Sequence, residues 1–347
     1  MPSGKMFFLW RHLNKLRWLT LSSVILVLIL IPYLHLYQSY TAAHAYDLLA
    51  SSEKRVYDVM ELLTAPFTSE PAEDLDVLKG NTWSATIGGV RLSDPLAVLS
   101  QFAASLSVNW SFLVTAIIPV LFTLFFGRVF CGWICPATFI YELNSNLASW
   151  LRWAGIKLPD QQFDGSLKYV VLIIGLILSL VTGSVLISAI YPPSIVGREI
   201  YYAIALEGFG IGAVFFIFTL LFDLLVARRG FCRYLCPGGA LYSLLSRYRV
   251  LRIRRIVENC NDCAKCNVVC EFGLDPMGDN FSQECTNCAA CIAVCPTQAM
   301  TFVLKPTDYP VQGAGHLGRR YHREQDKFIL DGNAEDKGDN SINQGAA

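Results

Sequence analysis

The sequence lacks the motifs that mark several common redox cofactors. It contains no Cys-x-x-Cys-His, so covalently attached c-type haem is not expected. Haem b between membrane helices needs facing axial ligands, and His35 is the one histidine inside an apolar stretch. No Gly-x-Gly-x-x-Gly unit stands between an expected strand and an expected helix, which argues against NAD in a Rossmann domain. We therefore expect neither haem nor a nicotinamide cofactor on this chain.

Charged residues are also scarce. They make up 16% of the 347 residues, whereas 53% are hydrophobic, and no nucleic acid partner is expected. Four stretches are long and apolar enough to cross a bilayer, at about residues 18–37, 106–127, 169–191 and 208–227. Buried core helices are also apolar, but four stretches of this length favour transmembrane helices in contact with membrane lipid.

Lysine and arginine are distributed unevenly around these stretches. Residues 1–17 carry four bases and no acid, whereas residues 38–105 carry nine acids and four bases, a net charge of −5. Eight arginines follow the fourth stretch before the next acid, Glu258. The positive-inside rule then predicts a multi-pass protein of the bacterial inner membrane with both termini in the cytoplasm. No clear cleavage site directly follows the first apolar stretch, so we expect it to stay as an anchor.

Eight of the twelve cysteines form two runs with the spacing C-x2-C-x2-C-x3-C. This spacing is typical of ferredoxins with two [4Fe–4S] clusters, in which the fourth cysteine of each run binds the other cluster. Zinc is the main alternative, but the third cysteine of each run would be surplus for a four-coordinate ion. Glu271 follows the first run where proline is usual, whereas Pro296 follows the second. The expected cluster ligands are Cys260, Cys263, Cys266, Cys270, Cys285, Cys288, Cys291 and Cys295.

The other four cysteines form a second repeated motif, Phe-Cys-x3-Cys-Pro. Its copies contain Cys131 and Cys135, and Cys232 and Cys236, at a constant offset of 101 residues. The same offset pairs Arg128 with Arg229 and Tyr141 with Tyr242, which indicates an internal duplication.

Three interpretations of these four cysteines stay open. The four sulfurs can hold one further metal or cluster. They can instead form two redox dithiols, because Arg228, Arg229 and Arg233 lie close enough in sequence to lower a thiol pKa. The third interpretation is that they are merely small apolar residues in helices.

Two further groups of polar residues are weaker candidates. Charged and aromatic residues lie in and beside an expected short outer loop at 192–206. They suit a quinone head group, although any membrane interface contains such residues. Asp223 lies inside the fourth stretch, where an acid is either functional or paired with a nearby arginine. The members of the first group are Tyr191, Arg198, Glu199, Tyr201 and Tyr202.

The combination of motifs resembles the NapH/MauN family of membrane-bound polyferredoxins. The likeness covers about residues 93–300 and includes the segments DPLAVLSQFA, FCGWICP and FDLLVARRGFCRYLCPGGALY, and both cluster runs. It implies a quinol dehydrogenase-type subunit that passes electrons from quinol through its clusters to a periplasmic or membrane-bound redox partner. A looser likeness to membrane ferredoxins that reduce copper implies the alternative, a metal-reducing or maturation factor. The long loop at 38–90 and Glu271 depart from the family pattern.

These features predict a membrane all-α protein with four transmembrane helices and a C-terminal α+β ferredoxin-like domain. The expected divisions are a cytoplasmic N-terminus with the first helix (1–37), a periplasmic loop with amphipathic helices at about 42–63 and 94–104 (38–105), a membrane region with both Phe-Cys-x3-Cys-Pro motifs (106–250), a two-cluster domain (251–305) and a disordered tail (306–347).

Overall fold

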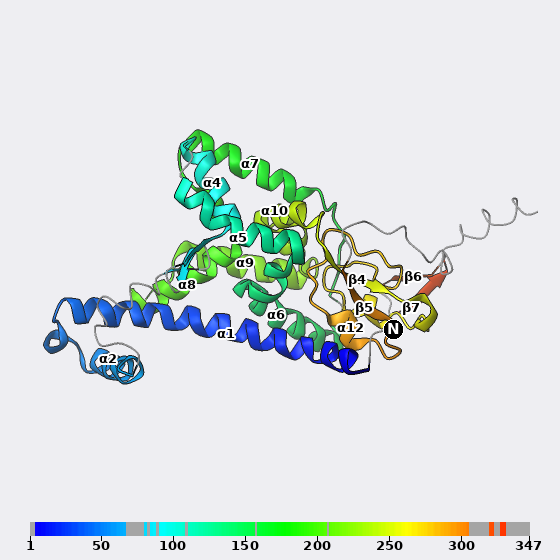
Figure 1. Ribbon diagram of the computed structural model, residues 1–347, viewed down its shortest axis with the longest axis horizontal. Coiled ribbons are helices and arrows are strands. Elements are labelled where there is room, and N and C mark those ends of the chain that lie inside the picture. Colours follow the sequence, from blue (N-terminus) through cyan, green and yellow to red (C-terminus); the bar gives the residue numbers. More distant parts are fainter. Residues whose placement is uncertain are drawn as a thin grey trace, which may run out of the picture.

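The computed structural model describes most of the chain up to Leu304 and two short strands beyond it. The described ranges are 4–66, 80–81, 84–87, 90–107, 110–156, 158–206, 208–304, 319–322 and 327–330. Helices fill one end and the middle of the molecule, and a smaller part with strands β4 and β5 lies at the other end, beside the N-terminus (Figure 1).

The helices are α1 (Gly4–Ala42), α2 (Ser51–Thr64), α4 (Pro95–Ser105), α5 (Trp110–Phe126), α6 (Pro136–Trp153), α7 (Leu167–Thr182), α8 (Pro192–Ala205), α9 (Ile211–Leu225), α10 (Pro237–Ser246), α11 (Lys265–Val269) and α12 (Ala290–Val294). Two π-helical turns, η3 (Phe130–Ile134) and η5 (Phe231–Leu235), precede α6 and α10. Short 3-10 turns are η1 (Tyr46–Leu48), η4 (Leu186–Ala189) and η6 (Val257–Asn259).

A helix occupies part of each of the four apolar stretches, but three of these helices are shorter than the sequence suggests. Within the described residues only α1 is long and apolar enough to cross a membrane, over His12–Ala42. Its 31 residues span about 46 Å at 1.5 Å per residue, more than the hydrocarbon core of about 30 Å. Helices α5, α7 and α9 have 17, 16 and 15 residues. Four transmembrane helices therefore remain a prediction.

The shorter apolar helices bury small residues and expose large ones. On α7, Gly175 and Ser179 are buried, whereas Ile173, Ile177 and Val181 are exposed. A Cβ atom added to Gly175 would lie 3.0 Å from the Ile187 side chain, so the helix packs closely there. This pattern is the reverse of a soluble helix and resembles helix packing in membranes.

The duplication extends to the order of secondary structure. In each half a short helix is followed by a longer apolar helix, a π-turn and a helix that starts with proline: α4, α5, η3 and α6, then α8, α9, η5 and α10. Helix α8 occupies the segment that the sequence analysis assigned to a loop. Proline at the first position of α6, α8 and α10 suits a helix start, because no hydrogen bond from that nitrogen is needed.

Helix α4 begins inside the protein and not at its outer surface. Asp94 caps it by accepting a hydrogen bond from the Leu96 amide at 2.8 Å. Its second carboxylate oxygen accepts one from the Tyr191 hydroxyl at 2.6 Å. Both residues are buried. The start of α4 is thus joined to the start of α8.

Three small antiparallel sheets complete the fold. Strands β1 (Gly80–Asn81), β2 (Ser84–Ile87) and β3 (Val90–Ser93) form one sheet in the segment predicted to be helical or loop. Strand β4 (Leu251–Arg255) pairs with β5 (Met300–Leu304), which brackets both cysteine runs. Strand β6 (Arg319–His322) pairs with β7 (Lys327–Leu330) within the tail, and the rest of the tail lies outside the described residues.

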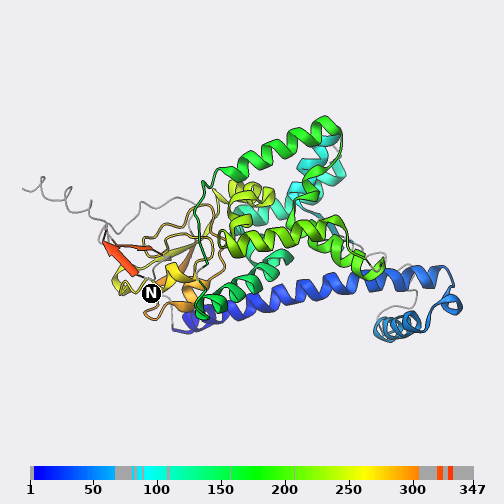
Figure 2. The ribbon, with the colours of Figure 1, turned by 180° about the vertical axis from the view of Figure 1, so that it is seen from behind.

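The two ends of α1 contact different parts of the molecule. Leu13 packs on the core of the cysteine-run domain. At the far end, Tyr37 packs with Met60 of α2. Helix α2 is seen nearly end-on where α1 runs across the view, so the two helices are not parallel (Figures 1 and 2).

Candidate functional site

The two ferredoxin-type runs fold into the same local shape. Each has a left-handed residue before its second cysteine and another directly after it: Asp262 and Ala264 in the first run, Asn287 and Ala289 in the second. A five-residue helix follows in each run, α11 or α12. These left-handed residues form the same tight loop around the second cysteine of each run.

The fourth cysteine of each run lies near cysteines of the other run. Burial raises the pKa of Cys266 to about 12, and the neighbouring thiols of Cys260, Cys295 and Cys263 raise it further. Burial likewise raises the pKa of Cys291, where the strongest thiol neighbours are Cys288, Cys285 and Cys270. These neighbours form two groups, each with three cysteines of one run and the last cysteine of the other. Two clusters would need this grouping, and cluster binding by either group stays a prediction.

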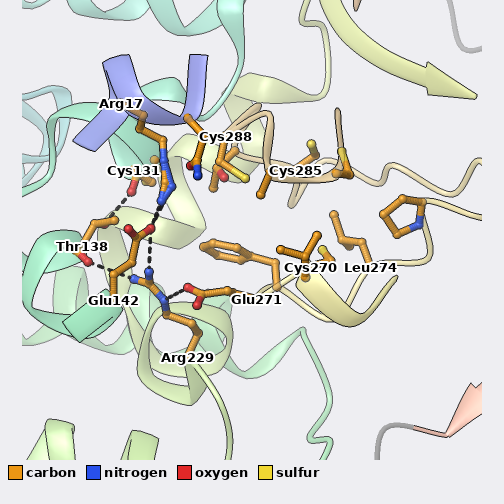
Figure 3. A pocket seen from close by; sticks show the side chains of 18 of the residues that line it. Arg17, Cys131, Thr138, Glu142, Arg229, Cys270, Glu271, Leu274, Cys285 and Cys288 are labelled. Atoms are coloured by element: carbon orange, nitrogen blue, oxygen red, sulfur yellow. Dashed lines mark hydrogen bonds and ion pairs between the residues drawn. The ribbon is translucent and has the colours of Figure 1, made fainter. Parts of the chain in front are cut away.

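One of these groups borders the membrane-helix region. Cys270, Cys285, Cys288 and Cys291 line a cavity of about 210 Å³. Cys131 lines the same cavity from the opposite side (Figure 3). We call this group the proximal set, and Cys260, Cys263, Cys266 and Cys295 the distal set.

The structure also brings the four remaining cysteines together. Cys131, Cys135, Cys232 and Cys236 line one small cavity, which we call the four-cysteine site. Each motif is a π-turn: the amide of Cys135 donates to the Phe130 carbonyl at 2.9 Å, and Cys236 repeats this bond. The two motifs are thus neighbours in the structure, and the three interpretations of their cysteines stay open. No group of three or more His, Cys, Asp or Glu side chains among the described residues is placed to hold a single metal ion, so a mononuclear centre stays a prediction.

Close packing around the four-cysteine site depends on glycine. A Cβ atom at Gly238 would lie 2.3 Å from the Tyr191 ring, and one at Gly239 would lie 3.1 Å from the Cys232 carbonyl. Tyr191 thus lies against the start of α10, close to Cys236. Tyr191 was expected at the outer surface together with Tyr201 and Tyr202. It lies instead beside the four-cysteine site, whereas Tyr201 and Tyr202 are near the other end of α8.

Arg229 acts to lower the pKa of the Cys232 thiol, as expected, but burial outweighs this effect and the pKa is raised. Burial raises the pKa of Cys135 and of Cys236 to about 12. It also raises the pKa of Cys131 and Cys232, although Arg128 and Arg229 act in the opposite direction. Cys135 and Cys236 are buried and Cys131 and Cys232 are partly buried, and both arginines are bound to carboxylates.

Arg229 belongs to an ion-pair network between the second motif and the first run. Its Nε lies 2.5 Å from Glu271 Oε2, and its Nη2 lies 3.1 Å from Glu142 on α6. Arg17 on α1 also binds Glu142 (Figure 3), and Arg228 binds Glu271. Burial opposes ionisation of Glu271, but Arg229 and Arg228 hold its pKa below the ordinary value. Glu271 therefore has a structural partner at the position where proline was expected.

Arg128 forms the corresponding network between the first motif and the second run. It binds Glu284, which precedes Cys285 and also binds Lys168. The Ser243 hydroxyl donates to the other Glu284 oxygen at 2.5 Å. Burial opposes ionisation of Glu284, but Arg128 and Lys168 hold its pKa below the ordinary value.

Three residues near the sites were missed by the sequence analysis as functional candidates. Asp94 holds Tyr191 beside the four-cysteine site. Phe272 lines both cavities, and Glu284 binds Arg128. A signal was present for Glu284, because it flanks a cluster cysteine as Glu271 does.

The weaker candidates have ordinary partners. Asp223 accepts a hydrogen bond from the Phe231 amide at 2.8 Å and so caps the second π-turn. Glu199 accepts one from the Gly210 amide at 2.6 Å. Tyr201 lies 3.3 Å from the His35 ring nitrogen. A quinone site among these residues stays a prediction.

In comparison with known proteins, one family model matches both copies of the Phe-Cys-x3-Cys-Pro motif. A family model described as a 4Fe-4S binding domain matches residues 108–154 and 209–256, which are the two Phe-Cys-x3-Cys-Pro segments. The ferredoxin-type protein NapH of Escherichia coli is 34% identical over 207 residues, covering 59% of this chain and 69% of that protein. The methylamine utilization ferredoxin-type protein MauN of Methylorubrum extorquens is 31% identical over 224 residues, covering 63% of this chain and 74% of that protein.

A more distant relative is the putative electron transport protein YccM of Escherichia coli, 28% identical over 211 residues, which are 56% of this chain and 57% of that protein. No solved structure matches the chain. The identity to NapH and MauN extends over more than two thirds of each relative. The chain therefore belongs to the NapH/MauN family of ferredoxin-type iron–sulfur electron-transfer proteins.

Proposed function

We propose that this protein is a membrane-anchored relay between the quinol pool and a redox partner protein. The distal and proximal sets each hold one [4Fe–4S] cluster, and the four-cysteine site holds a third iron–sulfur or metal group. When bound, such clusters supply one-electron carriers, and a quinol that loses two electrons releases two protons. The chain's own residues fix the positions of these groups relative to the membrane.

One observation carries this proposal: Cys131 of the four-cysteine site lines the same cavity as the four cysteines of the proximal set. A relay needs short distances between successive carriers. The two-cluster domain is therefore not an appendage on a flexible linker, because it is packed directly against the repeated motifs. The order that this geometry supports is four-cysteine site, proximal set, distal set.

The comparison supports a cluster at the four-cysteine site over copper or free dithiols. The matched family model is described as binding 4Fe-4S, and its two segments contain Cys131, Cys135, Cys232 and Cys236 but none of the eight ferredoxin-type cysteines.

We further propose that α1, α5, α7 and α9 cross the bacterial inner membrane. The large apolar side chains that α5, α7 and α9 expose would contact lipid. Leu13 of α1 packs on the two-cluster domain, so the basic N-terminus and the clusters lie on one side. The positive-inside rule assigns that side to the cytoplasm.

Reporter fusions test this topology. A reporter that is active only in the periplasm is expected to be active when it is joined after Ala65, at the end of α2. It is expected to be inactive when it is joined after Leu304. A reporter that is active only in the cytoplasm is expected to show the reverse. Equal behaviour of the two fusion sites would refute an odd number of crossings between them.

The relay itself is tested by reduction with quinol. The full chain, reconstituted with iron and sulfide in lipid vesicles, is mixed anaerobically with a ubiquinol or a menaquinol while the cluster absorbance is followed. We expect bleaching by at least one quinol type, because the proposed role begins with quinol oxidation. Dithionite provides the control for full reduction, and protein-free vesicles provide the blank. If dithionite bleaches the clusters and neither quinol does, the quinol assignment is wrong.

A further inference from the structure

Two carboxylates flank the proximal set, one at each junction with the membrane-helix region. Glu271 directly follows Cys270, and Glu284 directly precedes Cys285. The arginine bound to each carboxylate comes from a different repeat: Arg229 binds Glu271 and Arg128 binds Glu284.

These two arginines are equivalent in the duplicated sequence. The 101-residue offset that relates the Phe-Cys-x3-Cys-Pro motifs also relates Arg128 to Arg229, each three residues before the first cysteine of its motif. They are 1% and 2% exposed. A buried charge of this kind needs its partner, since removal of one member of such a pair is costly. Each repeat thus contributes one buried bridge to the same set of cluster cysteines.

Three residues are common to the four-cysteine site and the proximal cavity, because Cys131, Thr138 and Phe272 line both. The Arg128 guanidinium lies 5.4 Å from the centre of the Phe272 ring, which ties this ring to the first bridge.

The backbone is also in close contact at this place. A Cβ atom at Gly132 would lie 3.0 Å from the Thr286 carbonyl oxygen. The Trp133 indole donates to the Asn287 carbonyl at 3.2 Å. The first π-turn therefore lies directly on the loop of the second run.

We infer that the two-cluster domain exchanges electrons with the four-cysteine site at a junction formed by Cys131 and Phe272, and that the Arg128–Glu284 and Arg229–Glu271 bridges are positioning pairs that hold this junction closed. The inference rests on the proposed relay. It identifies the proximal set as the one that faces the membrane domain, and it gives the repeated arginines one shared role.

The experiment compares Glu271→Gln, Glu284→Gln and their combination with a matched control, Glu258→Gln. Glu258 is an exposed acid two residues before Cys260 of the distal set. The rate of bleaching by quinol is expected to fall by roughly 10- to 100-fold in the double variant, a range typical of residues that orient metal ligands. The Glu258→Gln rate is expected to equal the wild-type rate.

Two further readouts separate positioning from general stability. EPR-monitored redox titration is expected to show a higher reduction potential for one cluster only in the Glu271→Gln and Glu284→Gln variants, because each loses a negative charge beside the proximal set. Glu271→Asp keeps the carboxylate and is expected to restore most of the rate. Phe272→Leu is expected to slow reduction by quinol while iron content and both potentials stay unchanged.

The outcomes distinguish the inference from the relay on which it rests. If quinol fails to reduce the wild-type protein, the relay is wrong. If quinol reduces the wild type, the Phe272→Leu variant and the double variant at equal rates, the junction is wrong and the relay stands. If a glutamate variant loses iron, Phe272→Leu decides, since it changes no charge and no ligand.

Discussion

A chain that carries both Cys270→Ala and Cys285→Ala is expected to lose no more iron than either single variant. Each change removes a ligand from the proximal set, so each should remove the same cluster and about four of roughly eight iron atoms in the two-cluster domain. The structure supports this prediction because both cysteines line the same cavity and both neighbour Cys291. Iron and sulfide assays on purified protein measure the loss.

The complementary pair gives the opposite result. Cys266 and Cys270 belong to one run, but they fall in different sets. The double variant Cys266→Ala with Cys270→Ala is therefore expected to lose both clusters, about eight iron atoms. If each run instead held its own cluster, this pair would lose only about four atoms and the Cys270–Cys285 pair would lose about eight. The two double variants thus exclude one arrangement or the other. The iron content of each variant is subtracted from that of the wild type, so iron bound at the four-cysteine site cancels.

The cluster loops were predictable from sequence because their geometry is local. Within a run, a few residues and two left-handed backbone positions determine where the cysteine side chains point. The exchange of the fourth cysteine also follows from the spacing, since a cluster that is bound from one short loop needs a more distant fourth ligand. The two copies of the Phe-Cys-x3-Cys-Pro motif were recognisable because their residues recur at one offset.

Helix ends in the membrane region were less predictable. Apolar composition continues to about Tyr191, but α7 ends at Thr182 with Gly183 in the left-handed conformation. The chain then turns inward and α8 starts at Pro192, beside the four-cysteine site. Hydropathy measures the preference of a segment for lipid and carries no information on where the backbone turns. The return of α4 and α8 into the protein was therefore not predictable.

The contacts that join distant segments were also outside the reach of sequence patterns. Tyr191 and Asp94 are 97 residues apart, and Arg128 and Glu284 are 156 residues apart. Nothing local to either partner specifies the other. Glu271 was noticeable only as a missing proline, and its ion pairs with Arg228 and Arg229 provide the physical reason for an acid there.

Replacement of all four cysteines Cys131, Cys135, Cys232 and Cys236 by alanine is expected to stop reduction of the two-cluster domain by quinol. The loss should exceed the roughly 10- to 100-fold typical of changes beyond the direct ligands, because the proposed carrier nearest the membrane is removed entirely. Reduction by dithionite is expected to be unchanged, since the eight ferredoxin-type cysteines remain. The single variant Cys232→Ala is the matched partner of Cys131→Ala. Both remove one sulfur of the four-cysteine site, but only Cys131 also lines the proximal cavity.

The same three variants separate the relay from a metal-reducing or maturation role. In the relay, iron content falls together with the rate of reduction by quinol, and added copper has no effect on either. If the quadruple variant keeps the wild-type rate with quinol but no longer binds or reduces copper, the sulfurs handle a metal substrate and the relay order fails. A larger loss of the rate of reduction by quinol in Cys131→Ala than in Cys232→Ala would indicate that electrons enter the two-cluster domain beside the first repeat. Gly132 brings the backbone against Thr286 at that place. Equal losses would instead indicate that the four sulfurs act as one unit, with the carrier between the repeats and no preferred side.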